Sequence, residues 1–147
     1  MDRCSVLSEE YLLKAYDIMT PEIRFIDKNS PIKEAALRMI NEGIGALIVV
    51  DQEGPIGIVT KRDIIWGVLF EKRDPEKEPV EKIMSTPLIM IDSSSDIVQI
   101  LDLMIRNNIS HLPVREGDKV IGMISDMDLL EVFRDVIEIV NARRIKK

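Results

Sequence analysis

The sequence predicts an α/β (α+β) fold built from two copies of one small unit, each with the element order β-α-β-β-α. Three observations lead to this prediction. One register of similar residues repeats through most of the chain, apolar residues recur at helical spacing, and turn residues lie between β-branched runs. Strands and helices that alternate in this way indicate a mixed fold rather than an all-helical or all-β one.

The internal repeat has a period of 65 residues and holds without a gap from about Ile18 to Asp128. The clearest match lies between Gly57–Asp63 and Gly122–Asp128, in which a glycine and two apolar residues precede Thr or Ser and, three residues on, Asp. The same separation relates further residues of like character: Met19 and Met84, Ile26 and Ile91, Met39 and Met104, Leu47 and Leu112, and Ile56 and Ile121. An ungapped register of this length predicts two structural repeats.

Each repeat is predicted to begin with a short strand and a helix. The apolar stretches Arg24–Ile26 and Ile89–Ile91 precede polar turns in which Ser30 and Ser95 are candidate helix N-caps. Apolar side chains then recur at helical spacing, at Ile97, Ile100, Leu101, Met104 and Ile105 in the second repeat and at Ala35, Ala36, Met39 and Ile40 in the first. This spacing predicts one apolar face on each helix.

Two strands around a turn follow in each repeat. Apolar runs at 46–50 and 56–59 flank the turn 51–55, and the corresponding runs at 112–114 and 120–124 flank 116–118. Turn residues between β-branched runs are typical of hairpins. The final helices are expected to begin at Thr60 and Ser125, and Gly43 is expected to end the preceding helix of the first repeat.

The repeats divide the chain into five expected parts. Residues 1–15 form an N-terminal helix capped by Ser8, 16–71 the first repeat, 72–79 a charged linker with two prolines, 80–135 the second repeat, and 136–147 a C-terminal helical extension. The basic residues at the end of that extension suit a helix C-terminus.

The composition narrows the class of protein. Of 147 residues, 46% are hydrophobic and 31% are charged, which is typical of a folded globular chain. No apolar run approaches the ~20 residues that cross a bilayer, and no secretory signal precedes the repeats. One Cys and one His cannot complete a zinc site, and a net charge of −6 disfavours nucleic acid. We therefore expect a cytoplasmic, metal-free protein that binds neither membrane nor nucleic acid.

On these residues the chain resembles the CBS-domain family, named after the regulatory region of cystathionine β-synthase. The matching pieces are Ile18–Pro21 and Ile83–Pro87 at the start of the repeats, Gly57–Asp63 and Gly122–Asp128 at their end, and Ser110–Val114 as a second strand. The resemblance covers residues 16–135. It implies a tandem CBS-domain pair with pseudo-two-fold symmetry that often forms homodimers.

The resemblance also implies a ligand. In the family, clefts between two motifs bind AMP, ADP, ATP or, in some members, S-adenosylmethionine as a regulatory ligand, for example in energy sensing. The Asp of each closing signature holds the ribose, the preceding Thr or Ser contacts phosphate or ribose, the opening segment lines the base, and basic residues on the second strand meet phosphate. Carried to this chain, the implied residues are Thr20, Pro21, Thr60, Asp63, Thr86, Pro87, His111, Ser125 and Asp128.

Elementary chemistry agrees with part of this assignment. An ionised Asp can accept hydrogen bonds from two vicinal hydroxyls, and a helix start offers unpaired N–H groups to phosphate. Lys61 and Arg62 add positive charge beside the first signature, whereas Asp126 and Met127 occupy these positions in the second. We therefore expect two sites of unequal affinity. No cofactor is required, and the output of such a module would pass through an effector protein.

Other interpretations remain open from the residues alone. Thr60 with Asp63, and Ser125 with Asp128, also fit helix capping boxes, and His111 could be an ordinary surface histidine. A ligand-free dimerisation or protein-interaction scaffold is the main alternative function. An enzyme acting on a nucleotide is a further one, although the sequence contains no P-loop, HExxH or nucleophile-elbow motif.

Overall fold

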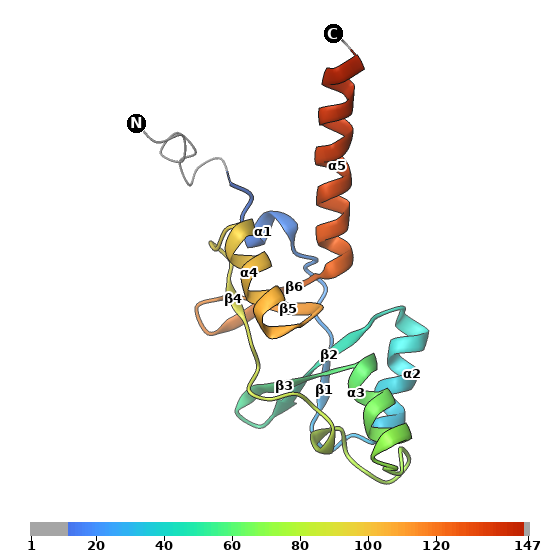
Figure 1. Cartoon of the computed structure of the whole chain (residues 1–147). Coiled ribbons are helices and arrows are strands. Elements are labelled where there is room, and N and C mark those ends of the chain that lie inside the picture. Colours follow the sequence, from blue (N-terminus) through green and yellow to red (C-terminus); the bar gives the residue numbers. More distant parts are fainter. Residues whose placement is uncertain (1–11, 146–147) are drawn as a thin grey trace. The chain divides into compact units, whose positions relative to one another are not determined.

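The computed structural model describes residues 12–145 and confirms the predicted α/β fold with two three-stranded sheets (Figure 1). The chain divides into two units. The central unit contains Ile23–Ile89, and the terminal unit joins the residues up to Glu22 with those from Met90 onward. Each unit has the predicted order β-α-β-β-α around its own sheet.

In the central unit, a mixed sheet positions the end of one strand beside the start of a helix. Its elements are β1 (Phe25–Asp27), α2 (Ile32–Glu42), β2 (Ala46–Asp51), β3 (Gly54–Thr60), α3 (Lys61–Ile65), the π-helical η3 (Trp66–Phe70) and the 3-10 helix η4 (Val80–Lys82). Strand β1 pairs in parallel with β2, and β2 pairs antiparallel with β3. The short α3 therefore follows directly from the last residue of an edge strand.

The terminal unit repeats this arrangement. Its elements are α1 (Ala15–Ile18), β4 (Ile91–Asp92), α4 (Ile97–Asn107), β5 (His111–Glu116), β6 (Lys119–Ser125) and α5 (Asp126–Ile145). Leu112 pairs with Ile124 across β5 and β6 just as Leu47 pairs with Val59 across β2 and β3. Because both partners shift by the same 65 residues, the two sheets share one register.

The units do not coincide with the repeats of the sequence, because each repeat begins with a segment that packs on the other repeat. We call residues 13–20 and 78–85 the opening segments. Thr20 exchanges backbone hydrogen bonds of 2.8 and 2.9 Å with Met123 of β6, and Ser85 exchanges bonds of 2.8 and 3.1 Å with Ile58 of β3. The expected boundaries 16–71 and 80–135 describe the repeats, and as domain limits they stay a prediction.

The opening segments are part of the hydrophobic cores. The core cluster of the central unit consists of Ile26, Ile32, Ala35, Met39, Leu47, Val49, Val59, Val80 and Ile83. Val80 and Ile83 come from the second opening segment, and Ala15 of the first is likewise fully buried. Removing buried apolar area from water is the main favourable term in folding, so each unit depends on a segment from the other repeat for its stability.

Two details of the predicted helices are wrong. Ser30 and Ser95 are not N-caps: Pro31 precedes α2 without a side-chain cap, and Asp96 caps α4 by accepting a 2.9 Å hydrogen bond from the Gln99 N–H. Ser95 lies in the turn before the helix instead, where its carbonyl oxygen accepts a 2.8 Å hydrogen bond from the Ala15 N–H. Gly43, with φ of 67°, ends α2 in the left-handed conformation as predicted.

The apolar faces of α2 and α4 are also narrower than predicted. Ile40 and Ile105 are 76% and 75% exposed, whereas Met39 and Met104 beside them are buried. Ile40 and Ile105 occur at equivalent positions of the two repeats, eight residues after Ile32 and Ile97, the first residues of their helices. At about 3.6 residues per turn, eight residues are more than two full turns, so both side chains lie past the face that meets the sheet.

Most of the predicted N-terminal helix lies outside the described residues. Within them, α1 covers only Ala15–Ile18. Leu13 and Lys14 are extended because they pair with the start of α4: Ile97 donates a 2.8 Å backbone hydrogen bond to Leu13, and Lys14 forms a β-bridge with Asp96. An extended segment at this point anchors the first opening segment to the terminal unit.

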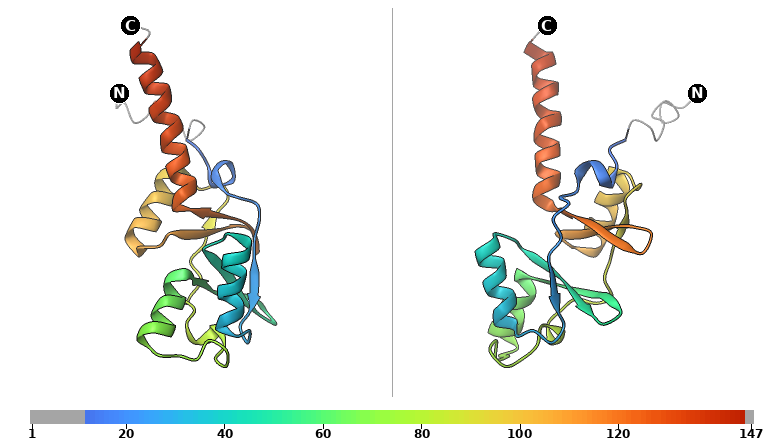
Figure 2. Two further views of the ribbon diagram at one scale, coloured as in Figure 1. Left: turned by 90° about the vertical axis from the view of Figure 1, so that its right-hand side faces the viewer. Right: turned by 180° about the vertical axis from the view of Figure 1, so that it is seen from behind.

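Helix α5 is the longest element of the terminal unit, with 20 residues. It continues directly from β6, and Figures 1 and 2 show that its C-terminal part extends away from the sheet of its unit. The predicted C-terminal helix is thus confirmed as far as residue 145. Among residues 12–145, no helix has the length and apolarity needed to cross a membrane.

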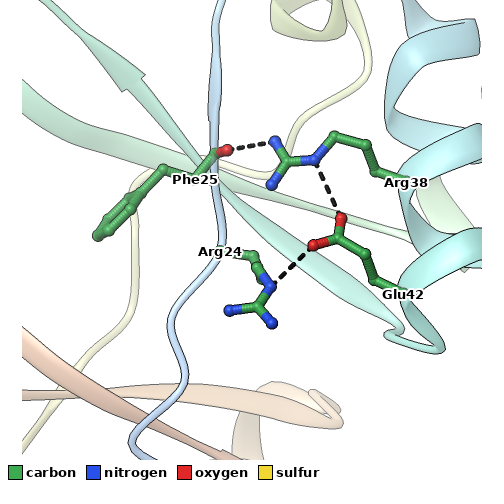
Figure 3. A network of polar contacts seen from close by, with 4 residues as sticks. All are labelled: Arg24, Phe25, Arg38 and Glu42. Carbon is green, nitrogen blue, oxygen red and sulfur yellow. Dashed lines mark hydrogen bonds and ion pairs between the residues drawn. The ribbon is translucent and has the colours of Figure 1, made fainter.

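A polar network holds the end of α2 against β1 (Figure 3). Arg24 and Arg38 donate hydrogen bonds of 2.9 and 3.2 Å to the two carboxylate oxygens of Glu42, and Arg38 also donates to the Phe25 carbonyl. The hydrogen bond from Arg38, followed by that from Arg24, holds the pKa of Glu42 below its ordinary value of 4.5. Ionised Glu42 is therefore favoured in the folded chain.

The stability of the central unit is expected to fall with acidity partly through Glu42. A carboxyl whose pKa is lowered on folding stabilises the fold above its ordinary pKa, and this contribution is lost as the pH falls through the folded value. We expect Glu42→Gln to lose less stability than the unsubstituted chain between about pH 5 and pH 3, as measured by urea unfolding. Glu34→Gln on the same helix is the control. Parallel pH profiles for Glu42→Gln and the unsubstituted chain would contradict the expectation.

Candidate functional site

The first candidate site lies where β3 ends and α3 begins. Thr60 is the N-cap of α3, and its hydroxyl accepts a 3.3 Å hydrogen bond from the Asp63 N–H. In return, Asp63 Oδ2 accepts bonds of 2.9 and 3.0 Å from the backbone N–H and the hydroxyl of Thr60. The capping interpretation is therefore confirmed, and it fixes the carboxylate of Asp63 in one orientation.

The second opening segment completes this site. Ser85 Oγ donates a 3.2 Å hydrogen bond to Asp63 Oδ1, so the closing signature of one repeat meets the opening segment of the other. We call Thr60, Asp63 and Ser85 the Asp63 cluster. Ser85 is not among the residues that the family resemblance implies, which point to Thr86 and Pro87. The 65-residue register was the available signal, because it pairs Ser85 with Thr20.

A pocket of about 280 Å³ adjoins the Asp63 cluster, lined by Arg62, Asp63, Trp66, Glu71 and Ile83. Trp66 is 58% exposed and stacks on Phe70 with a centroid distance of 4.9 Å. Aromatic faces of this kind provide stacking surfaces for bases, while the cation of Arg62 and the carboxylate of Asp63 provide polar contacts. The pocket thus combines a flat apolar surface with hydrogen-bonding groups of both signs.

The second candidate site has the same construction in the terminal unit. Asp128 Oδ2 accepts a 2.8 Å hydrogen bond from the Ser125 N–H, and Ser125 Oγ accepts a 3.2 Å bond from the Asp128 N–H. Thr20 of the first opening segment donates to Asp128 Oδ1 over 3.5 Å, a longer contact than that of Ser85 with Asp63. We call Thr20, Ser125 and Asp128 the Asp128 cluster.

The remaining implied residues are divided between the units. His111 begins β5, lies half-buried and pairs with Ser125 in the register of β5 and β6, which places it beside the Asp128 cluster. In the central unit, Arg62 lines the pocket, whereas Lys61 is exposed and donates its backbone N–H to Gly45 at 3.1 Å. The exposed Pro21 and Pro87 follow Thr20 and Thr86 in the chain, and the Thr86–Pro87 peptide is cis.

Comparison with protein families decides the identity of the repeat. The model of the CBS domain matches residues 15–69 and again residues 80–135. The chain belongs to the CBS-domain family. It is a tandem CBS pair, and the two matched stretches contain both closing signatures and both hydroxyl-bearing ends of the opening segments.

Individual relatives extend over most of this CBS pair. An uncharacterized 17.7 kDa protein of Acidianus ambivalens is 33% identical over 84% of this chain and 74% of its own length. A conserved protein from Pyrococcus horikoshii has a crystal structure with a TM-score of 0.77 at 29% identity, covering 82% of this chain and 92% of that one. Two further curated archaeal relatives are longer, and the CBS pair spans 52% and 32% of them.

A third relative was solved with bound ligands. The CBS domain pair of protein MJ0100, in complex with 5′-methylthioadenosine and S-adenosyl-L-methionine, is 26% identical and has a TM-score of 0.76. The match covers 84% of this chain and 98% of that chain. CBS pairs of this similarity therefore include a protein that holds adenosyl compounds.

The two clusters of this CBS pair differ in the charge around them. Lys61 and Arg62 follow Thr60, whereas Asp126 and Met127 follow Ser125. At the start of the second strand the ionisable residue belongs to the other unit: the terminal unit has His111, and the central unit has Ala46 at the equivalent position. Similar hydrogen-bonding cores therefore lie in different electrostatic surroundings.

Proposed function

We propose that this CBS pair is a non-catalytic regulatory module that binds an adenosyl ligand at the Asp63 and Asp128 clusters and signals to an effector protein. The ligand class comprises AMP, ADP, ATP and S-adenosylmethionine. We also propose that the protein acts in the cytoplasm, as its composition suggests, and that it forms a homodimer, as the family resemblance implies. The adenosyl ligand is a regulatory one, and no other cofactor is part of the proposal.

One observation carries the proposal. In both units the closing Asp is oriented by its own capping box and accepts a further hydrogen bond from a hydroxyl of the opposite opening segment. Ser85 is 22 residues from Asp63 in the sequence, and a helix cap alone does not need a hydroxyl from so distant a segment. Each carboxylate oxygen can accept more than one hydrogen bond, so Asp63 Oδ1 can also receive a ribose hydroxyl beside Ser85.

The pocket at the Asp63 cluster suggests an order of ligands. Its lining contains one cation, Arg62, and two carboxylates, Asp63 and Glu71, of which Glu71 lies 3.2 Å from Arg73. Several phosphates would bring added negative charge next to these carboxylates, which is unfavourable at short range. We expect AMP or S-adenosylmethionine to bind at this cluster more tightly than ATP, with the adenine stacked on Trp66.

The decisive experiment is calorimetric titration with AMP, ADP, ATP and S-adenosylmethionine, accompanied by tryptophan fluorescence. Trp66 is the only tryptophan of the chain, so its emission reports on the Asp63 cluster and separates that site from the Asp128 cluster. We expect Asp63→Asn to weaken this binding by about tenfold or more, because the amide lacks the charge that strengthens bonds to hydroxyls. The asparagine keeps an acceptor for the helix cap, so the unfolding midpoint should change little.

Asp102→Asn is the matched control, because Asp102 is an exposed aspartate that pairs with Arg106 on the surface of α4. It should leave both affinity and stability as they are. If none of the four ligands binds below millimolar concentration, the sensor function is wrong and a ligand-free scaffold takes its place. Turnover of a nucleotide by the purified chain would instead establish the enzyme alternative.

A further inference from the structure

Glu71 lines the pocket at the Asp63 cluster and is held there by two contacts. Its backbone N–H donates a 3.0 Å hydrogen bond to the Trp66 carbonyl, at the end of η3. One of its carboxylate oxygens, Oε2, lies 3.2 Å from Arg73 Nη2. The other oxygen, Oε1, has no hydrogen-bond partner among residues 12–145, so it can accept a hydrogen bond from a ligand.

The charges around Glu71 are not balanced within the protein. Arg73 is shared, because its Nη1 also lies 3.1 Å from the carboxylate of Glu78, so one guanidinium serves two carboxylates. In the pocket lining, Arg62 is the cation beside the carboxylates of Asp63 and Glu71, and it forms no ion pair within the described part of the chain. A ligand that carries both a positive and a negative group would therefore find a charged partner for each.

Adenosyl compounds differ in the group that they carry at the 5′ position of the ribose. AMP, ADP and ATP carry phosphate, and 5′-methylthioadenosine carries a neutral thioether. S-adenosylmethionine carries an amino acid, whose ammonium group matches Glu71 and whose carboxylate matches Arg62. Its sulfonium adds a further positive charge, which is favourable next to two carboxylates. The pocket lining therefore fits an amino-acid tail better than phosphate.

The equivalent positions of the terminal unit carry different residues. Adding the 65 residues of the repeat to Arg62, Trp66 and Glu71 leads to Met127, Glu131 and Val136 on α5. A thioether, a carboxylate and an isopropyl group thus replace the cation, the aromatic face and the carboxylate of the pocket. Recognition of an amino-acid tail by these groups is therefore expected at the Asp63 cluster and not at the Asp128 cluster.

We propose that Glu71 determines the ligand specificity of the Asp63 cluster: its carboxylate binds the ammonium group of an S-adenosyl amino acid, while Arg62 binds the carboxylate. This role rests on the proposed function, because the adenosine must be bound at Asp63 and Trp66 for its tail to reach Glu71. It goes further in naming the side chain that separates S-adenosyl amino acids from nucleotides. The central unit is then a sensor of an S-adenosyl amino acid.

Titration of the full chain with four probes, followed through Trp66 fluorescence and calorimetry, tests this role. The probes are S-adenosylmethionine, S-adenosylhomocysteine, which keeps the tail without the sulfonium charge, 5′-methylthioadenosine, which lacks the tail, and AMP. We expect the two compounds with a tail to bind at least tenfold more tightly than the two without. Glu71→Gln should weaken both tailed compounds about tenfold, leave 5′-methylthioadenosine unchanged and strengthen AMP, because a negative charge near the phosphate is removed.

Glu76→Gln is the matched control, because Glu76 lies 3.2 Å from Lys33, the same distance as Glu71 from Arg73, but does not line the pocket. It should change none of the four affinities. Arg62→Gln should weaken AMP and the tailed compounds alike, in contrast to Glu71→Gln. If Glu71→Gln weakens the tailed compounds no more than 5′-methylthioadenosine, the role of Glu71 is wrong and the proposed function stands. If none of the four probes binds, both are wrong.

Discussion

Leu47→Ala is expected to lower the free energy of unfolding of the central unit by about 2–5 kcal/mol. Leu47 is fully buried on β2 and belongs to the cluster that joins β1, α2, β3 and the second opening segment. Truncation removes apolar contacts and leaves a cavity that a close-packed core closes only in part. Urea unfolding measured by circular dichroism gives the change.

Ile40→Ala is the control for this core substitution. It also removes three carbon atoms from a residue of the central unit, but at a position that is 76% exposed. We expect its effect to stay within about 0.5 kcal/mol, as for most surface substitutions. Equal losses for Leu47→Ala and Ile40→Ala would mean that the core is not organised around β2.

Gly57→Ala is expected to disturb stability and ligand binding together. A Cβ atom at Gly57 would lie 2.8 Å from the carbonyl oxygen of Ser85 and 3.0 Å from Thr86 Cγ2. The first contact is with backbone, so the second opening segment must move away from β3 and carry Ser85 away from Asp63. We expect a loss of about 1–3 kcal/mol, as in other overpacked sites, and a weaker response of Trp66 to ligand.

Gly122→Ala is the matched variant in the terminal unit, where the added Cβ would meet the side chain of Met19 and lie 3.0 Å from the carbonyl oxygen of Thr20. It should weaken binding at the Asp128 cluster and leave the Trp66 signal intact. Gly57→Ala should have the reverse pattern. If either glycine variant affects both sites equally, the two clusters are not independent, and the separate construction of the units is contradicted.

The fold could be predicted from the sequence because the 65-residue repeat and the apolar periodicities are visible in the order of residues along the chain. The same patterns identify Val80 and Ile83 as apolar, but they contain no information on which of two similar sheets buries them. That choice depends on the path of the chain in three dimensions, and for this reason the exchange of opening segments was not predictable. Ser85 was missed although the 65-residue register pairs it with Thr20, because its hydrogen bond to Asp63 exists only once the second opening segment lies beside the start of α3.

Helix starts show a second limit. Ser95 and Asp96 are adjacent, and both residue types are good N-caps. Only the backbone geometry decides between them: Ser95 is used in the turn that meets Ala15, so Asp96 is the residue whose side chain reaches the Gln99 N–H. At Thr60 no such competition exists, and the capping box with Asp63 is found as predicted.

The exchange of opening segments also has a consequence for the order in which the chain can fold during synthesis. The central unit, Ile23–Ile89, is continuous in sequence, and Ser85 is only 22 residues from Asp63. Thr20 is 108 residues from Asp128, so the terminal unit cannot close until the chain as far as Asp128 has left the ribosome. The two clusters are built alike but come into existence at different times: the central one can form early, and the first opening segment must wait for the start of α5.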